Sequence, residues 1–263
     1  MGGEARKVYD EANEMLDQAI AEKWLSANAV FGLYPVKRIE DDALVLDEAG
    51  NTSATFHFLR QQGKKGKGVP NRSLADYLHL TEIDYLGCFA VTSGFGMETK
   101  LAEFQKAGDD YNDIMFKSIA DRLAEATAEY IHELVRKEYW GYAPDENLEN
   151  DSLVREEYLG IRPAPGYPAC PEHSEKITIS QLLDMENEIG IELTSSFAMY
   201  PTSSVSGFFF GNPESKYFGL GKIGEDQVAS YAERKGISLR DAERLLSPNL
   251  AYTSQFTLAE SNL

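Results

Sequence analysis

Residues 162–173, RPAPGYPACPEH, combine the features that best suit a chain for holding a small ligand. Four prolines fall within nine residues, and each fixes its own φ angle, so the stretch is predicted to be extended and stiff. Arg162 offers a planar fork for a carboxylate, and Tyr167 offers a rigid ring with a polar tip. The small residues Ala164 and Gly166 would let a ligand approach the backbone closely. The alternatives are a proline-rich surface loop and a ligand for another domain's aromatic groove.

Other motifs in the chain carry weaker chemical signals. Cys170 and His173 have the spacing of metal ligands, but no second Cys/His pair follows at a usable distance, so no metal site is predicted. The same two residues lack a third group that would orient a nucleophilic pair. The sequences GFG at 94–96 and GLG at 219–221 match no complete dinucleotide or phosphate-loop fingerprint. We therefore assign no catalytic residue and no metal ligand.

Two more groups are candidates for binding. Asp121, Glu125 and Glu129 recur every four residues and share one face of a predicted helix. That face is either solvated or the acidic edge of a cleft for a cation. Tyr217 and Phe218 follow a turn and are predicted to begin a strand, where binding groups often lie.

Charge and composition exclude several classes of function. The 263 residues include 43 acidic and 25 basic side chains, for a net charge of −18. A nucleic-acid binder needs Lys and Arg to neutralise phosphates, and docking on an anionic membrane needs basic residues too, so neither partner is expected. There is no signal-peptide pattern and no run of 18 apolar residues. Only two cysteines occur, which favours a cytoplasmic location.

The order of predicted elements favours an α+β fold. Helices are predicted over residues 7–23, 111–140, 226–235 and 239–246, and a strand start followed by a helix over 174–190. Strands are predicted over residues 29–34, 43–46, 54–59, 83–91, 195–199, 205–210 and 217–223. Because the elements do not alternate as βαβ units, we expect a single domain over residues 1–263. It would have a mainly antiparallel twisted sheet flanked by helices, with one long central helix.

Six segments together resemble one known family, the C-terminal activation domain of cobalamin-dependent methionine synthase. They are RPAPGYPACPEHSEK at 162–176, DDYNDIM at 109–115, DRLAE at 121–125, YWGYAP at 139–144, SFAM at 196–199 and PESKY at 213–217. The resemblance runs from about residue 11 to residue 252. It implies a domain that binds S-adenosylmethionine and serves to reactivate cobalamin oxidised to the cob(II)alamin state. One electron from a flavoprotein and one methyl group from S-adenosylmethionine regenerate methylcobalamin in that family.

The resemblance also implies roles for individual residues. Arg162 would hold the methionyl carboxylate, and the backbone around Ala164 and Gly166 would contact the ligand. Tyr167 would lie near the face of cobalamin. Tyr217 and Phe218 would complete the S-adenosylmethionine site. Glu125 and Glu156 would accommodate the positive end of the ligand.

The chain departs from the family in what it lacks. The family's Asp-Trp-containing acidic segment does not precede Val8, so we expect the site to be completed differently or by a longer chain. No Asp-x-His-x-x-Gly motif is present, so cobalamin is expected on a separate module. No homocysteine or folate site is recognisable, and the chain alone is not expected to make methionine. The alternatives are a scaffold domain without ligand, a stand-alone reactivation protein acting in trans, and a self-sufficient S-adenosylmethionine-dependent methyltransferase.

The loop at residues 60–72 is a basic, glycine-rich exception in this acidic chain. We hypothesise that its cations dock an acidic, flavodoxin-like electron donor, which the negative charge elsewhere would repel. A solvated basic loop is the alternative. The cations concerned are Arg60, Lys64, Lys65, Lys67 and Arg72.

Overall fold

A computed structural model describes residues 2–254 and divides them into two compact units. Each unit is assembled from segments that lie far apart in the sequence. The first contains the described residues up to Phe31, together with Phe89–Leu134 and Leu183–Val205. The second contains Gly32–Cys88, Val135–Leu182 and the described residues from Ser206 onward.

The helices and strands follow the order expected of an α+β chain. The α-helices are α1 Gly3–Glu22, α2 Met97–Ala107, α3 Asp110–Leu134, α4 Asn150–Val154, α5 Glu175–Leu183, α6 Met185–Ile189, α7 Glu225–Lys235 and α8 Leu239–Leu245. The strands are β1 Ser26–Ile39, β2 Asp42–Leu46, β3 Thr52–His57, β4 Asp84–Phe95, β5 Glu192–Leu193, β6 Met199–Tyr200 and β7 Ser204–Phe209. Within the described residues, no helix is both long enough and apolar enough to cross a membrane.

Five strands form one antiparallel sheet in the order β3-β2-β1-β4-β7, which confirms the predicted α+β class. The hairpin of β2 and β3 is also as predicted. Its turn is closed by the Asp47 carboxylate, which accepts hydrogen bonds from the N–H groups of Ala49 and Asn51. An Asp side chain that bonds the backbone two residues ahead is a common way to build such a turn.

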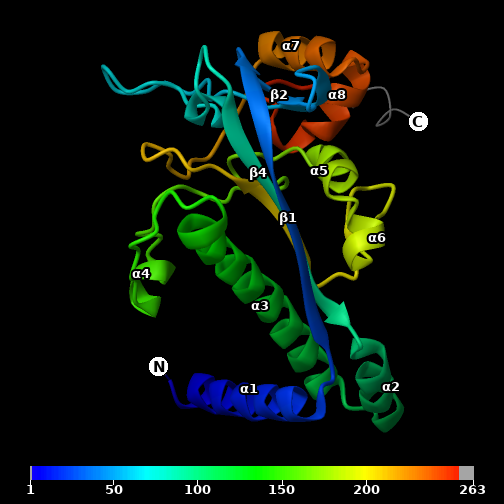
Figure 1. Cartoon of the computed structure of the whole chain (residues 1–263). Coiled ribbons are helices and arrows are strands. Elements are labelled where there is room, and N and C mark those ends of the chain that lie inside the picture. Colours follow the sequence, from blue (N-terminus) through cyan, green and yellow to red (C-terminus); the bar gives the residue numbers. More distant parts are fainter. Residues whose placement is uncertain (1, 255–263) are drawn as a thin grey trace, which may run out of the picture. The chain divides into compact units, whose positions relative to one another are not determined.

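The core of the first unit lies where α1, α2 and α3 pack together (Figure 1). Trp24, which follows α1, presents its ring edge-on to Phe104 of α2 and Phe116 of α3, at centroid distances of 6.4 and 5.5 Å. Edge-to-face pairs of this kind contribute beyond the area they bury. Gly96, the N-cap residue just before α2, has φ of +88°, a conformation that glycine adopts at little cost.

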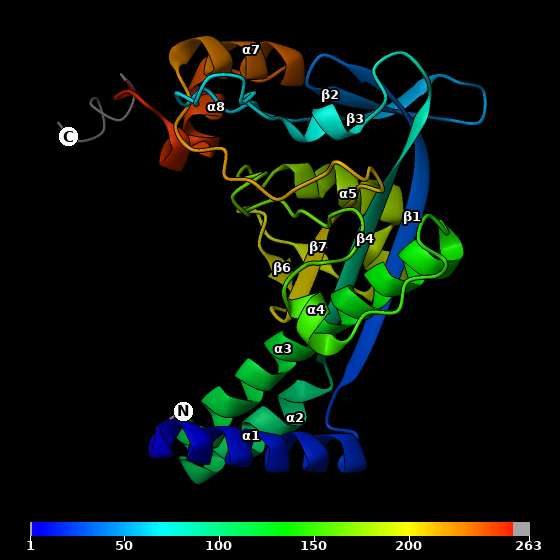
Figure 2. The ribbon, with the colours of Figure 1, turned by 90° about the vertical axis from the view of Figure 1, so that its left-hand side faces the viewer.

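The second unit has an aromatic core beneath the hairpin. Phe56 lies in β3 and Phe58 follows its end. Both pack on Phe208 of β7, with ring centroids 4.9 and 5.5 Å away. The helices α7 and α8 pack against each other, and α7 also contacts β3 (Figure 2). These helices bury a cluster of apolar side chains: Leu59, Leu220, Ile223, Val228, Tyr231, Ala232, Ala242 and Leu246.

The predicted long helix is confirmed, with α3 continued beyond Leu134 by one π-helical turn over Val135–Tyr139. Other predicted elements were wrong in type or extent. Residues 174–190 contain no strand, and their helix is broken at Asp184, which adopts φ of +48° between α5 and α6. Residues 217–223 form a loop, because their backbone bonds with other loops in place of a neighbouring strand. Of the strand predicted over 195–199, only Met199 is extended and paired.

Candidate functional site

The start of the predicted binding segment pairs antiparallel with the end of β7 and the residue that follows it. The N–H of Ile161 donates to the carbonyl of Phe210 at 3.0 Å, and the N–H of Phe210 donates back at 3.0 Å. The N–H of Phe208 donates to the Pro163 carbonyl at 2.8 Å. Gly160 precedes this pairing with φ of +83°, and a Cβ there would lie 2.4 Å from the Phe210 carbonyl oxygen. A proline suits position 163 because its carbonyl still accepts although it has no N–H to donate.

The same segment then makes a tight turn that presents Tyr167. The N–H of Gly166 donates to the Cys170 carbonyl at 2.7 Å, and the N–H of Cys170 donates to the Tyr167 carbonyl at 2.9 Å. Gly166 has φ of +97°, and a Cβ at this position would lie 2.4 Å from Cε1 of the His173 ring. Glycine is therefore required twice over, by its backbone conformation and by the ring beside it. Tyr167 is 52% exposed at the tip, whereas Ala164 is buried.

Tyr217 and Phe218 lie on a second loop that is bonded to the first. Asn212 turns the chain by accepting from the Glu214 N–H through its side chain, at 2.8 Å. After this turn, the Leu220 N–H donates to the Pro168 carbonyl at 2.8 Å. Phe218 packs against the ring of Tyr77, with centroids 6.5 Å apart. Both loops belong to the second unit, and their bonds fix one against the other.

Three polar groups meet where the two loops touch. The N–H of Arg162 donates to the hydroxyl oxygen of Tyr217 at 2.9 Å. The Nη1 of Arg162 donates to the hydroxyl of Tyr158 at 3.0 Å, and the two hydroxyls are 3.2 Å apart. Burial raises the pKa of Tyr217 although the bonds from Tyr158 and Arg162 oppose the shift, so the hydroxyl is neutral at physiological pH. The cluster offers a cation and a neutral hydroxyl side by side.

The two predicted carboxylates lie in different units. Glu156 follows α4 in the second unit and is exposed, and its negative charge raises the pKa of Tyr217. It adopts φ of +55°, a strained conformation for a residue with a side chain. Glu125 is half-buried on α3 in the first unit. The other predicted site residues all belong to the second unit, and among them the structure bonds Arg162 to Tyr217; they are Arg162, Ala164, Gly166, Tyr167, Tyr217, Phe218 and Glu156.

A buried ionic cluster supports the far end of the binding segment. Glu172 accepts from both the N–H and the hydroxyl of Ser174 at 2.6 Å, and from the Tyr231 hydroxyl at 2.8 Å. Lys235 of α7 pairs with Glu172 and with the fully buried Glu175. Burial raises the pKa of Glu175, while the ammonium of Lys235 opposes that shift. Buried charges are tolerated when they are paired and hydrogen-bonded in this way.

Cys170 and His173 form no reactive or metal-binding site in the described residues. Burial raises the pKa of the Cys170 thiol well above its usual value, and the nearby carboxylates Glu175 and Glu172 raise it further. The thiolate that a nucleophile needs is therefore suppressed. His173 Nδ1 lies 3.0 Å from the ammonium of Lys176. No group of three or more His, Cys, Asp or Glu residues suited to a metal occurs between residues 2 and 254.

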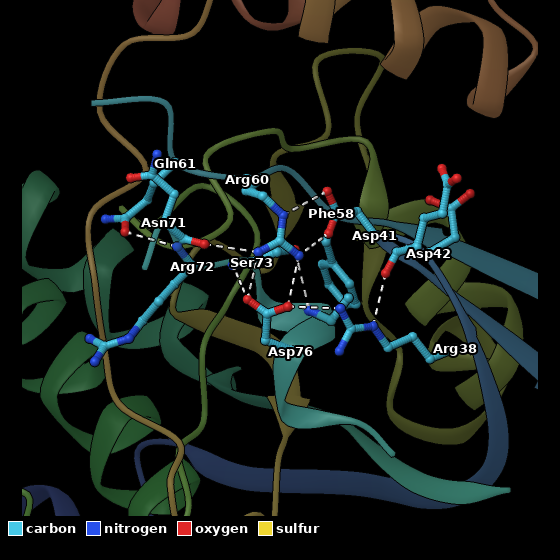
Figure 3. Close-up of polar contacts among 12 residues, drawn as sticks. Arg38, Asp41, Asp42, Phe58, Arg60, Gln61, Asn71, Arg72, Ser73 and Asp76 are labelled. Atoms are coloured by element: carbon cyan, nitrogen blue, oxygen red, sulfur yellow. Dashed lines mark hydrogen bonds and ion pairs between the residues drawn. The ribbon is translucent and has the colours of Figure 1, made fainter. Parts of the chain in front are cut away.

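Arg60 lies in a cluster of ion pairs at the base of the basic loop. Its guanidinium bonds both carboxylate oxygens of Asp76 at 2.7 Å and both oxygens of Asp41, at 3.2 and 2.5 Å (Figure 3). Arg38 adds a further bond to Asp76 at 2.8 Å. Figure 3 also shows the side chain of Arg72 extending away from this cluster. Arg60 therefore holds the base of the loop, while Lys64, Lys65 and Lys67 are exposed.

Sequence reasoning did not single out Tyr158, Arg136 or Glu146. Tyr158 is 7% exposed and Arg136 is fully buried, with its guanidinium carbon 4.5 Å from the centre of the Tyr158 ring. The one available signal was position, because Tyr158 precedes Arg162 by four residues. No sequence pattern separates a buried tyrosine four residues before the motif from an ordinary core tyrosine.

Comparisons with known proteins identify the family. The family described as "Vitamin B12 dependent methionine synthase, activation domain" matches residues 1–236. A solved structure described as the MetH reactivation domain bound to AdoHcy is 51% identical in sequence, with a TM-score of 0.91. The match covers 95% of this chain and 78% of that chain. This chain therefore belongs to the activation-domain family of vitamin B12-dependent methionine synthase, and is a module of a cobalamin-dependent methyltransferase.

Proposed function

We propose that this chain binds S-adenosylmethionine on the two bonded loops of the second unit and positions its methyl group for the reductive methylation of cob(II)alamin. The observation that carries the proposal is the cluster of Arg162, Tyr158 and Tyr217 beside the buried backbone of Ala164. The solved relative that shares 51% of the sequence is described as bound to AdoHcy, the product left when S-adenosylmethionine loses its methyl group. We propose the whole of residues 1–263 as this module, acting in the cytoplasm, where the two free thiols would stay reduced.

The chemistry of the ligand fits the groups in this cluster. S-adenosylmethionine carries a sulfonium and an ammonium against one carboxylate, so its net charge is positive. The Arg162 guanidinium would hold the carboxylate through a charge-assisted hydrogen bond. Glu156 is a carboxylate near Tyr217 and would face the positive end, with Glu125 as a second candidate. The small Ala164 and Gly166 would admit the ligand against the backbone, with Phe218 at its side.

Cobalamin, carried by a separate module, would supply the reduced metal centre that accepts the methyl group. The contribution of this chain is to bind and orient the methyl donor and to keep water away from it. Tyr167 is the exposed aromatic residue at the tip of the turn and is the candidate to face the corrin. No general base is needed, because a methyl group leaves a sulfonium without proton transfer. The cobalamin-binding module is accordingly the first partner that we propose.

The test is calorimetric titration of this chain with S-adenosylmethionine, repeated on Arg162→Ala. We expect the substitution to weaken binding roughly tenfold or more, which corresponds to about 1.4 kcal/mol. Arg244→Ala is the matched control, because Arg244 is exposed on α8 and pairs only locally with Asp241 among the described residues. Equal affinities of the wild type and Arg162→Ala would refute the assigned role. If neither this chain nor an N-terminally extended one bound the ligand, the scaffold alternative would hold.

We further propose that Lys64, Lys65 and Lys67 dock an acidic, flavodoxin-like electron donor. All three are exposed, whereas the chain as a whole carries a charge of −18. A local cationic patch on an acidic protein can steer an acidic partner to one face. Arg72 contributes from the base of the loop, and Arg60 contributes by holding that base through Asp41 and Asp76.

This docking surface can be tested by charge reversal within the full methionine synthase. Changing Lys64, Lys65 and Lys67 to Glu should slow flavoprotein-dependent reactivation. In the wild type, the rate of reactivation should fall steeply as salt is added. Changing Lys7, Lys23 and Lys106 to Glu alters the net charge equally in the first unit and should leave the rate nearly unchanged. An unchanged rate in the loop variant would exclude the loop as the docking surface.

A further inference from the structure

Arg136 and Glu146 form a buried, charge-neutral pair next to Tyr158, which contacts Arg162 of the proposed ligand site. The Arg136 side chain is fully buried and that of Glu146 is 8% exposed. The guanidinium bonds the carboxylate through Nε at 3.0 and 2.9 Å and through Nη2 at 2.6 Å. Arg136 lies in the single π-helical turn that ends the long helix, and such turns often occur at functional sites. This two-pronged arrangement fixes the plane of the guanidinium.

The ring of Tyr158 lies against this fixed plane. The guanidinium carbon of Arg136 is 4.5 Å from the ring centre, and that of Arg162 is 5.7 Å from the same centre. Because Glu146 balances the charge of Arg136, two cations can share one ring at little electrostatic cost. Tyr158 is buried, so its ring has little freedom to rotate away.

The donors present admit an arrangement of the hydroxyl protons that leaves a donor for the ligand. Arg162 can only donate, so the Tyr158 oxygen accepts from Nη1 and its own proton can go to Tyr217, 3.2 Å away. The Tyr217 oxygen then accepts twice, from Tyr158 and from the N–H of Arg162. In this arrangement the proton of the Tyr217 hydroxyl is oriented as a donor. Two donors, the guanidinium and this hydroxyl, are thereby set side by side.

We propose that Tyr158, supported by the Arg136–Glu146 pair, is a positioning residue that orients Arg162 and Tyr217 toward the carboxylate of the ligand. The proposal rests on the proposed function, since it assigns a supporting residue to the same site. A free arginine side chain loses considerable rotamer freedom when it binds. Holding Nη1 before the ligand arrives reduces that loss, which is how pre-organisation increases affinity.

The test compares two probes that differ in the carboxylate. S-adenosylhomocysteine carries the amino-acid group, whereas 5′-methylthioadenosine lacks it. We expect Tyr158→Phe, which keeps the ring and removes the hydroxyl, to weaken calorimetric binding of S-adenosylhomocysteine roughly three- to tenfold, within the net range of a typical intramolecular hydrogen bond. Binding of 5′-methylthioadenosine should change less than about twofold, because that probe makes no contact through Arg162.

A double-mutant cycle separates positioning from a general loss of structure. If Tyr158 acts through Arg162, Tyr158→Phe should add nothing to the loss caused by Arg162→Ala. Tyr34→Phe is the matched control in the same unit, because it removes the 2.7 Å bond from the Tyr34 hydroxyl to the Leu182 carbonyl. That control should bind both probes as the wild type does.

The outcomes distinguish this inference from the function on which it rests. Wild-type affinity in Tyr158→Phe, equal losses for both probes, or additive losses with Arg162→Ala would overturn the positioning role. If the wild type bound S-adenosylhomocysteine and Arg162→Ala weakened it, the proposed function would stand without this inference. If the wild type bound neither probe, both would fall.

Discussion

At the scale of single residues, Gly166 sets the shape of the turn that presents Tyr167. It combines φ of +97° with a close approach to the His173 ring. The ring is itself held, because its Nδ1 lies 3.0 Å from the ammonium of Lys176. Burial lowers the pKa of His173, and the charge of Lys176 lowers it further, so the ring is neutral at physiological pH. A neutral ring can pack against the backbone without a desolvation cost for charge.

Gly166→Ala should therefore reduce stability by more than backbone strain alone. The left-handed conformation costs roughly 1–2 kcal/mol for a residue with a Cβ, and the contact with His173 adds to it. Gly236→Ala is the matched control, because Gly236 has φ of +69° but a methyl group there would meet no other atom within 4 Å. Urea unfolding should give a larger loss for Gly166→Ala than for Gly236→Ala. Equal losses would mean that the His173 ring moves aside freely.

The residues of the site differ in how far sequence could predict them. Arg162, Gly166 and Tyr167 lie within one dense motif, so their residue types and spacing were enough to single them out. Tyr217 was found through its motif, although the strand predicted for it is a loop bonded to Pro168. Tyr158 acts through what it touches, a buried arginine 22 positions earlier, and no short pattern encodes such a contact.

At the scale of elements, hydrophobic periodicity predicted the position of helices and strands better than their ends. The hairpin of β2 and β3 and the helices α7 and α8 lie where predicted, since turn and capping residues bound them. Ser238, for example, caps α8 by accepting from the Asp241 N–H at 3.1 Å. The π-helical turn at Val135–Tyr139 was missed, because apolar spacing continues through it. The break at Asp184 was missed for the same reason.

The stability of that π-helical turn should depend on the guanidinium of Arg136 and not only on its positive charge. Arg136→Lys keeps the positive charge but loses the two-pronged bonding to Glu146, leaving part of a buried carboxylate unsatisfied. We expect the free energy of unfolding to fall by roughly 1–3 kcal/mol, the usual cost of such a group. Arg155→Lys changes an exposed pair with Glu157 and should alter stability by less than about 0.5 kcal/mol. Chemical denaturation of the two variants would measure the difference, and equal effects would contradict the expectation.

At the scale of the whole molecule, the excess of negative charge makes the few internal cations important. With 43 acidic against 25 basic side chains, a half-buried carboxylate needs a cation beside it to stay ionised. Asp76 is such a carboxylate. Burial alone would raise its pKa, but the bonds from Arg60 and from the Ser73 N–H outweigh burial and lower the pKa below 3.8. The Arg60 guanidinium thus counteracts the negative charge of the protein at the base of the basic loop.

Removing this carboxylate should change stability in a pH-dependent way. Because the pKa of Asp76 is lower in the folded state, its stabilisation is present above pH 3.8 and is lost as pH falls through the folded value. At pH 7 we expect the free energy of unfolding of Asp76→Asn to be roughly 1.5–3 kcal/mol lower than that of the wild type, which is the range for hydrogen bonds to charged groups. The difference should shrink below pH 3.8, as the wild type itself becomes protonated. Glu188→Gln removes the same charge from an exposed position on α6, and so corrects for the change in overall repulsion. Urea unfolding between pH 7 and pH 3 would show this convergence. A constant difference in the free energy of unfolding across that range would mean that the stabilisation by Arg60 does not depend on the ionised form of Asp76.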